Sequence, residues 1–269
     1  MNGLKGKVAL VTGGSSGLGE AIVCRLAREG AAVAVAGRDE ARTRAVAERA
    51  AGESATAGHD VATSWHLGDV ARVADCDRLV AEAVERHDHI DILVNSAGIW
   101  IEKPITEMSE QEYDLLMGAN LKGCYFMCRA AVRHMIGRRS GVIVNIASDS
   151  GIRGEPGAAA YSASKAGVIM LTRSLALDHG PDGVRVCSVS PAVFDTPMLA
   201  KAIAGAPDPA AYAEETERGV GYPVGRIGRP EELASVVAFL ASDEASFVTG
   251  SLVFADGGIT AGMYTAAGR

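Results

Sequence analysis

The sequence lacks the features that mark several classes of protein. It has no uninterrupted apolar stretch of the roughly 18 residues that a membrane-spanning helix needs, and residues 1–7 contain no apolar core of a secretory signal. Its five cysteines form no CxxC pair, so we expect neither a disulfide framework nor a metal site. The net charge is −7, whereas nucleic-acid-binding surfaces are normally basic. We therefore expect a cytoplasmic protein that binds neither membranes nor nucleic acid.

Aromatic residues are also scarce, at 5% of the chain, whereas glycine is abundant, with 32 residues of 269. Apolar residues make up 48%, which is enough to build a sizeable core. Because Ala, Val and Gly must do most of the packing, the composition favours elements that approach closely, such as helices on a parallel sheet. The length alone is compatible with one large domain or two small ones.

Short apolar runs typical of strands alternate with helical periodicities along the whole chain. Strands are expected at residues 7–11, 32–36, 64–67, 90–94, 141–146, 184–189 and 251–254, and helices at 18–28, 41–51, 73–86, 109–134, 161–178 and 231–242. This alternation predicts an α/β fold: a doubly wound, Rossmann-like, mainly parallel seven-stranded sheet with helices on both faces. No linker rich in Pro, Ser and Gly divides the chain, so we predict one domain over residues 1–269. Prolines interrupt the alternation of strands and helices near residues 194–222, and we interpret this segment as a substrate lid.

A glycine-rich loop, TGGSSGLG at residues 12–19, separates the first predicted strand from the first helix. Its glycines let the backbone turn sharply and approach a pyrophosphate, and the helix behind it supplies free N–H groups. The spacing is not GxGxxG, and no Gly-Lys-Ser/Thr follows, which excludes a P-loop. A flexible turn is the alternative interpretation. The candidate nucleotide contacts in the loop are Gly13, Ser15, Ser16, Gly17, Leu18 and Gly19.

The end of the second predicted strand indicates which nucleotide is bound. An acid there would bind a ribose 2′-hydroxyl, whereas an arginine nearby would suit a 2′-phosphate. Gly37 stands at the acid position and Arg38 follows it, so NADP is favoured. Asp39 could neutralise Arg38 or bind the ribose itself, which keeps NAD as the alternative. A solvated loop cation is the simplest alternative role for Arg38.

A third group of residues has the chemistry of an acid–base site. Tyr161 and Lys165 are spaced i, i+4 on a predicted helix and so share one face. An ammonium beside a phenol favours the phenolate, so we expect the pKa of Tyr161 to fall below its ordinary value of about 10. Ser148 follows a predicted strand, where its hydroxyl could hold a substrate oxygen. Each of these motifs, taken singly, also occurs by chance.

Taken together, the motifs resemble the short-chain dehydrogenase/reductase family in its compact single-domain form. The resemblance runs from about Lys7 to Gly258 and rests on TGGSSGLG, Asp69-Val70, Asn95-Ser96-Ala97-Gly98, Asn120, Ser148, Tyr161-x3-Lys165 and Pro191-x4-Thr196, in this order. It implies a catalytic tetrad of Asn120, Ser148, Tyr161 and Lys165. It also implies that the cofactor is contacted by Gly13, Gly17, Gly19, Asp69, Val70, Asn95, Ala97, Gly98, Tyr161, Lys165, Pro191, Phe194 and Thr196.

The resemblance further implies hydride transfer between NAD(P) and a secondary alcohol or ketone, with Tyr161 as general acid and base. Lys165 would lower the pKa of Tyr161 and hold the nicotinamide ribose, Ser148 would bind the substrate oxygen, and Asn120 would position a water that relays protons. The implied partners are a small-molecule alcohol or ketone and further copies of the chain, as a homotetramer or homodimer. A non-catalytic nucleotide-binding regulator and an epimerase or dehydratase are the alternatives. The Tyr161-x3-Lys165 spacing argues against an enoyl reductase.

The sequence departs from the family pattern after the sixth strand. Ala192 stands where glycine is common, which requires a backbone without strongly positive φ. Phe194 is bulky for a position near the nicotinamide amide. We expect substrate contacts from Ser148, Trp100, Glu155 and Met198, with Arg153 at the same rim. A core tryptophan and solvated loop charges are the alternatives for these positions.

Overall fold

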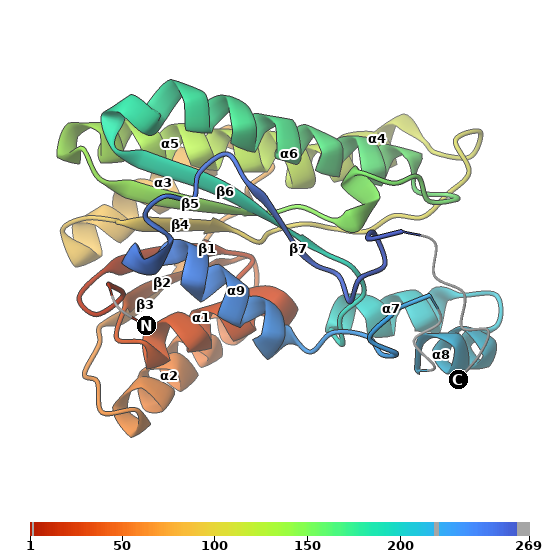
Figure 1. Ribbon diagram of the computed structural model, residues 1–269, viewed down its shortest axis with the longest axis horizontal. Helices are drawn as coiled ribbons and strands as arrows, with labels where there is room; N and C mark the ends of the chain where they lie inside the picture. The colour runs from red at the N-terminus through yellow and green to blue at the C-terminus, as the bar shows by residue number, and fades with distance from the viewer. Residues whose placement is uncertain (2, 218–220, 263–269) are drawn as a thin grey trace.

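The computed structural model describes residues 1, 3–217 and 221–262, and Figure 1 shows a single sheet between two layers of helices. The strand order is β3-β2-β1-β4-β5-β6-β7, and every neighbouring pair is parallel, which confirms the predicted fold. The strands are β1 (Val8–Thr12), β2 (Ala32–Gly37), β3 (Thr63–Leu67), β4 (Ile92–Asn95), β5 (Gly141–Ile146), β6 (Val184–Pro191) and β7 (Leu252–Ala255).

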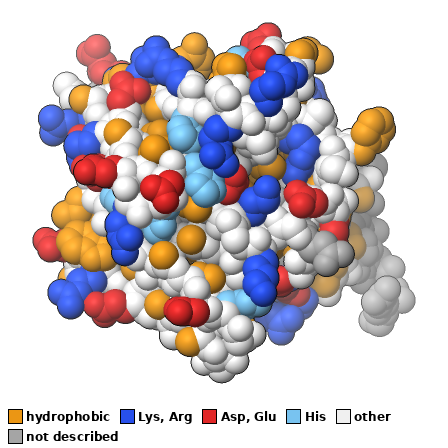
Figure 2. All heavy atoms as spheres, turned by 90° about the vertical axis from the view of Figure 1, so that its left-hand side faces the viewer, with side chains coloured by type: hydrophobic (Ala, Val, Ile, Leu, Met, Phe, Trp, Pro, Cys, Tyr) orange, Lys and Arg blue, Asp and Glu red, His pale blue; other side chains and the backbone are white. Residues whose placement is uncertain are grey.

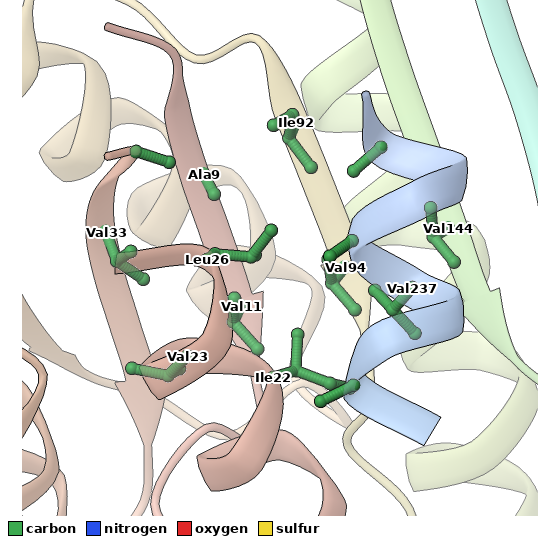
Figure 3. Close-up of a cluster of buried hydrophobic side chains, with 14 of the residues drawn as sticks. Ala9, Val11, Ile22, Val23, Leu26, Val33, Ile92, Val94, Val144 and Val237 are labelled. Atoms are coloured by element: carbon green, nitrogen blue, oxygen red, sulfur yellow. The ribbon is translucent and has the colours of Figure 1, made fainter. Parts of the chain in front are cut away.

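The central strands are buried on both faces because their side chains alternate between two apolar cores. In β1, Ala9 and Val11 point into one core, and Val8 and Leu10 point into the other. The first core is formed with α1 (Gly17–Arg28), α2 (Glu40–Thr56) and α9 (Pro230–Ala241), and Figure 3 shows its small aliphatic side chains interlocking. The second is formed with α3 (Val73–His87), α5 (Gly123–Arg138) and α6 (Ala159–His179).

The helical region expected at residues 109–134 is one continuous path with a local change of pitch. It consists of α4 (Glu110–Met117), a π-helical turn (Gly118–Lys122) and α5. Ser109 and Glu112 form the capping box that starts α4. π-Helical turns inside α-helices are frequent at functional sites, and this one contains Asn120.

The segment interpreted as a lid contains two helices, α7 (Pro197–Gly205) and α8 (Pro209–Glu217). Ala206 ends α7 with an extended backbone, φ −71° and ψ 152°, because it precedes Pro207. Both helices lie beside the main body of the molecule, at the right of Figure 1. Residues 218–220 of this segment, and the tail 263–269, lie outside the described residues.

The opposite end of the molecule faces the viewer in Figure 2, where acidic and basic side chains are interspersed and histidines gather near the middle. All five cysteines are free and buried. Within the described part of the chain, no helix is long and apolar enough to cross a membrane. No three His, Cys, Asp or Glu side chains among those same residues are arranged to hold a metal ion.

Candidate active site

Two adjoining clefts lie at the edge of the sheet where the parallel strands end. The first, which we term the nucleotide cleft, is lined by the loops after β1, β2, β3 and β4. The second, the reaction pocket, is lined by the segments after β4, β5 and β6, by α6 and by the lid helices. Strand order reverses between β1 and β4, and doubly wound folds bind their ligands at such a point. The residues common to both clefts are Leu18, Ser96, Gly98, Ile99, Thr196 and Met198.

The glycine loop forms a surface on which side chains would not fit. Gly13 has φ +65°, and a Cβ there would lie 2.7 Å from Ala97 Cα. A Cβ on Gly19 would collide with the Gly13 carbonyl oxygen. Ser16 precedes α1 without its side chain capping the helix, so the first N–H groups of α1 are left for another acceptor. Close backbone approach and an uncapped helix N-terminus fit a bound pyrophosphate.

The charged residues after β2 are arranged around the start of α2. Asp39 accepts a hydrogen bond from Arg42 N at 3.0 Å. Its carboxylate also forms an ion pair with Arg42 Nε at 3.1 Å. Arg38 lines the nucleotide cleft, is exposed, and has no ion pair with any described residue. Asp39 therefore does not neutralise Arg38. Arg42, which also lines the cleft, is a residue that our sequence analysis missed; its place three residues after the capping Asp39 is the signal.

Asn95 lies below the clefts rather than in their lining. Its Nδ2 donates to Asn145 Oδ1 at 2.9 Å in the buried interior. Contrary to our expectation, its side chain does not line the cofactor cleft.

Asn120 also lies behind the lining of the clefts, and its side chain is hydrogen-bonded to the backbone of Ile99. Its Oδ1 accepts from Ile99 N at 2.8 Å, and its Nδ2 donates to Ile99 O at 3.0 Å and to Ser164 Oγ at 3.2 Å. Both amide hydrogens are engaged, so one lone pair of Oδ1 is what remains for the water that we expected Asn120 to position. The two hydrogen bonds to Ile99 hold the segment after β4 in place.

The reaction pocket brings together the three other residues of the expected tetrad. Tyr161 and Lys165 come from the first turns of α6, and Ser148 follows β5. Lys165 Nζ donates to Ile146 O at 2.9 Å and lies 5.6 Å from the centre of the Tyr161 ring. The Trp100 ring meets the Tyr161 ring edge-on, with 4.4 Å between centroids. Trp100 therefore lines the pocket, as one of our two interpretations expected.

Burial dominates the electrostatics of these groups. It lowers the pKa of Lys165 from 10.5 to about 8. Burial also raises the pKa of Tyr161 above 10; a hydrogen bond with Ser148 lowers it, and the charges of Asp149 and Glu155 raise it further. Our expectation of a lowered Tyr161 pKa is therefore wrong for this structure. The reason is that desolvation of the buried phenol has the largest effect on its pKa, and Lys165, which donates to the Ile146 carbonyl, does not offset it.

Ser148 is held by a polar network that the sequence analysis did not identify. Its Oγ donates to Asp149 Oδ1 at 3.0 Å and accepts from Ser150 N at 3.2 Å. Arg153 donates to Asp149 Oδ2 from Nε at 2.9 Å and from Nη2 at 2.6 Å. Glu155 accepts from Ser150 Oγ at 2.6 Å. The signal for Asp149 was its position directly after Ser148 at the end of a strand.

The remaining predicted residues all lie in one or both clefts. Phe194 is buried and packs against Gly228, and Ala192 avoids positive φ as its side chain requires. Cofactor candidates in the linings are Gly13, Ser15, Ser16, Gly17, Leu18, Gly19, Arg38, Asp69, Val70, Ala97, Gly98, Pro191, Phe194 and Thr196, and substrate candidates are Ser148, Trp100, Glu155 and Met198.

Comparison with known proteins finds similar sequences that are named as reductases and dehydrogenases. A family model described as "Enoyl-(Acyl carrier protein) reductase" matches residues 13–260. A 3-oxoacyl-[acyl-carrier-protein] reductase of Thermotoga maritima is 37% identical over 95% of this chain and 98% of its own. The 3beta-hydroxysteroid dehydrogenase 1 of Eggerthella lenta is 40% identical over 96% of this chain and 95% of its own.

Solved structures agree with the fold as well. The crystal structure of levodione reductase matches with a TM-score of 0.89 and 35% identity, over 96% of this chain and 98% of that one. A putative short-chain alcohol dehydrogenase from Sinorhizobium meliloti matches with a TM-score of 0.85 and 34% identity, over 96% of this chain and 98% of the other. The similarity therefore extends over nearly the whole chain, clefts included.

Proposed function

The chain belongs to the short-chain dehydrogenase/reductase family, and we propose that Tyr161 is the general acid and base of its reaction. The protein is an NAD(P)-dependent oxidoreductase that transfers a hydride between the cofactor and an alcohol or ketone. The observation that carries the role of Tyr161 is its place with Ser148 and Lys165 in a pocket that adjoins the nucleotide cleft. Besides the hydride, ketone reduction needs one proton delivered to the substrate oxygen, and alcohol oxidation needs one proton removed from it. A single acid–base group can do both.

Each residue has a distinct part in this proposal. When bound, NAD(P) supplies the carbon that gives or accepts the hydride. Tyr161, whose pKa burial keeps high, holds a proton at neutral pH and donates it to a substrate oxygen during ketone reduction. Ser148 orients that oxygen by hydrogen bonding. Lys165 keeps two N–H donors beyond its bond to Ile146 O, and these are available to the nicotinamide ribose.

We assign NADP as the preferred cofactor, with NAD as the weaker alternative. Support comes from Arg38, which is exposed at the nucleotide cleft, while Asp39 is occupied by Arg42. A Cβ at Gly37 would collide with Thr43 Oγ1, so an acid at that position would require rearrangement. A guanidinium matches the charge and the bidentate geometry of a 2′-phosphate, neither of which a ribose hydroxyl offers.

Arg38→Leu tests this preference. A charge-assisted hydrogen bond of about 1.5 kcal/mol corresponds to a KM for NADPH about tenfold higher, and the KM for NADH should stay within about twofold. Arg44→Leu is the matched control, because Arg44 is exposed on α2, pairs with Glu48 and does not line the cleft. Equal effects of Arg38→Leu on both cofactors would contradict the assignment.

We propose a neutral ketone or secondary alcohol with an apolar body as the substrate. The pocket walls beyond Ser148 and Tyr161 are largely apolar and include Trp100, Val193, Phe194, Met198, Leu199 and Tyr212. The relatives named above act on a 3-oxoacyl group, a steroid and levodione, which are all carbonyl or hydroxyl compounds. A panel of such compounds, followed by NADPH absorbance, tests this function. No turnover with any compound, together with tight cofactor binding, would instead favour a nucleotide-binding regulator.

We further propose one domain over residues 1–269, with the 194–222 segment as its lid. Met198, Leu199, Ala202 and Tyr212 from α7 and α8 line the reaction pocket, which supports this role. A homotetramer or homodimer is the expected assembly. Exposed apolar side chains on α4, α5 and α6, namely Leu115, Tyr125 and Met170, support it, and sedimentation equilibrium measures it.

A further inference from the structure

Trp100 packs directly against the phenol ring of Tyr161 in the reaction pocket. The two rings meet edge-on, with an interplanar angle of 70° and 4.4 Å between their centroids. This is about the shortest separation that aromatic pairs adopt. Within the described part of the chain, no other aromatic ring contacts Tyr161. The indole therefore covers one side of the phenol, and water cannot lie there.

The backbone on both sides of Trp100 is fixed by hydrogen bonds. Before it, the Asn120 side chain binds the N–H and the carbonyl oxygen of Ile99, at 2.8 and 3.0 Å. After it, Lys103 N donates to Gly157 O at 2.8 Å, directly ahead of α6. The segment that carries the indole is thus attached to the π-helical turn and to the start of the helix that carries the phenol. These attachments keep the two rings in their relative position.

We propose that Trp100 is a positioning residue that holds the Tyr161 ring and excludes water from it, which keeps Tyr161 in the protonated form that ketone reduction uses. The inference rests on the proposed function, because it concerns the acid form of Tyr161. Burial has the largest effect on the pKa of Tyr161 and raises it, and Trp100 is an apolar group in contact with the ring. The hydrogen bond with Ser148 acts in the opposite direction and lowers this pKa.

Four charged side chains near Tyr161 also influence its protonation. Asp149 and Glu155, both from the segment after β5, raise its pKa. Arg153 pairs with Asp149 at 2.6 Å and so partly offsets that charge. Lys165 Nζ lies 5.6 Å from the centre of the phenol ring. All four are retained when the indole is replaced, so that replacement tests the exclusion of water apart from charge.

The test is a pH titration of the nucleotide-free protein with difluorotyrosine in place of Tyr161. The fluorine atoms make the phenol more acidic, which brings its ionisation toward the pH range of the folded protein. Fluorine NMR then reports this residue alone. We expect Trp100→Ala to lower the pH of ionisation by about one unit, because water then reaches the phenol. Trp100→Leu, which replaces the indole with a smaller apolar group, should lower it by less.

Tyr212→Ala is the matched control. Tyr212 is an aromatic residue of α8 that also lines the reaction pocket, but its ring does not contact that of Tyr161. Its loss widens the same pocket, and it should shift the ionisation less than half as far as Trp100→Ala does. An equal shift in the two variants, or no downward shift in Trp100→Ala, would overturn the proposal.

Kinetics of ketone reduction, with the natural Tyr161 in place, give a second readout. Trp100→Ala should lower kcat about tenfold, because the acid is no longer held in place. A higher KM with an unchanged kcat would mean that Trp100 is only a wall of the pocket, and would refute the positioning role.

The titration needs neither cofactor nor turnover, so its failure is distinguishable from failure of the proposed function. If no ketone is reduced but Trp100→Ala shifts the ionisation, the proposed function fails and the role of Trp100 stands. If ketones are reduced by the wild type and no shift occurs, the role of Trp100 alone fails. Should Trp100→Ala not fold, Trp100→Leu decides: a downward shift supports the proposal, and no shift or an upward one refutes it.

Discussion

Replacing Lys165 with methionine should abolish turnover and, at the same time, stabilise the folded protein at neutral pH. Lys165 is 6% exposed, and its ammonium donates to one protein acceptor, Ile146 O at 2.9 Å. Burial lowers its pKa from 10.5 to about 8. The folded protein therefore carries a poorly solvated charge that methionine, of similar length, would not carry.

The expected magnitude follows from these values. At about 1.4 kcal/mol for each pKa unit, holding Lys165 charged at pH 7 costs the folded state about 3 kcal/mol. Methionine loses the hydrogen bond to the Ile146 carbonyl, which costs about 1 kcal/mol. Lys165→Met should therefore raise the free energy of unfolding of the nucleotide-free protein by about 2 kcal/mol at pH 7.

The pH dependence of this gain identifies its origin. Because the folded pKa lies below the unfolded one, the cost is complete below pH 8 and disappears as the pH rises toward 10.5. Urea unfolding at several pH values measures it, with Lys5→Met at an exposed lysine as the control. A variant less stable than the wild type at pH 7, or a gain that does not shrink at high pH, would refute this account of the site.

Two other predictions concern the nucleotide loop and acid stability. Gly19→Ala should weaken cofactor binding more than tenfold in a titration, because the added Cβ collides with the Gly13 carbonyl oxygen. Gly52→Ala is the control, because a Cβ there lies in open space on α2. Equal affinities of the two variants would contradict the prediction. His66 and His87 both contact Ser64 Oγ, and burial lowers both pKa values from 6.5, so the unfolded state takes up more protons in acid. The free energy of unfolding should fall as the pH drops below about 6.5, and less so in His87→Gln; identical acid limbs would contradict this.

Much of the fold could be predicted because its signals are local. Uninterrupted Val and Ala runs predict strands buried on both faces, and β1 and β2 have that environment. The helix expected from residue 109 begins at Glu110, directly after its capping residue Ser109. The π turn at 118–122 and the division of the lid into α7 and α8 were not predicted. The π turn depends on contacts with the rest of the protein, which residue spacing does not record, whereas the break after α7 has a local signal in Pro207.

The site was predictable as a set of positions but not as a set of hydrogen bonds. Ser148, Tyr161 and Lys165 meet in one pocket because each lies near the end of a strand or the start of a helix at the same edge of the sheet. The hydrogen bonds between Asn120 and Ile99 join residues that are 21 apart in sequence, and no periodicity in the sequence indicates them. The direction of the Tyr161 pKa depends on burial, which spacing cannot supply.

The most direct test of the central claim is Tyr161→Phe, measured for cofactor binding and for turnover in parallel. The variant loses one hydroxyl from the reaction pocket, while the nucleotide cleft keeps its lining. The account predicts NADPH affinity within about twofold of the wild type and turnover below about 1% of it, since acid–base catalysis contributes 10²–10⁴-fold. Turnover above a few percent, with the same affinity, would show that another group moves the proton.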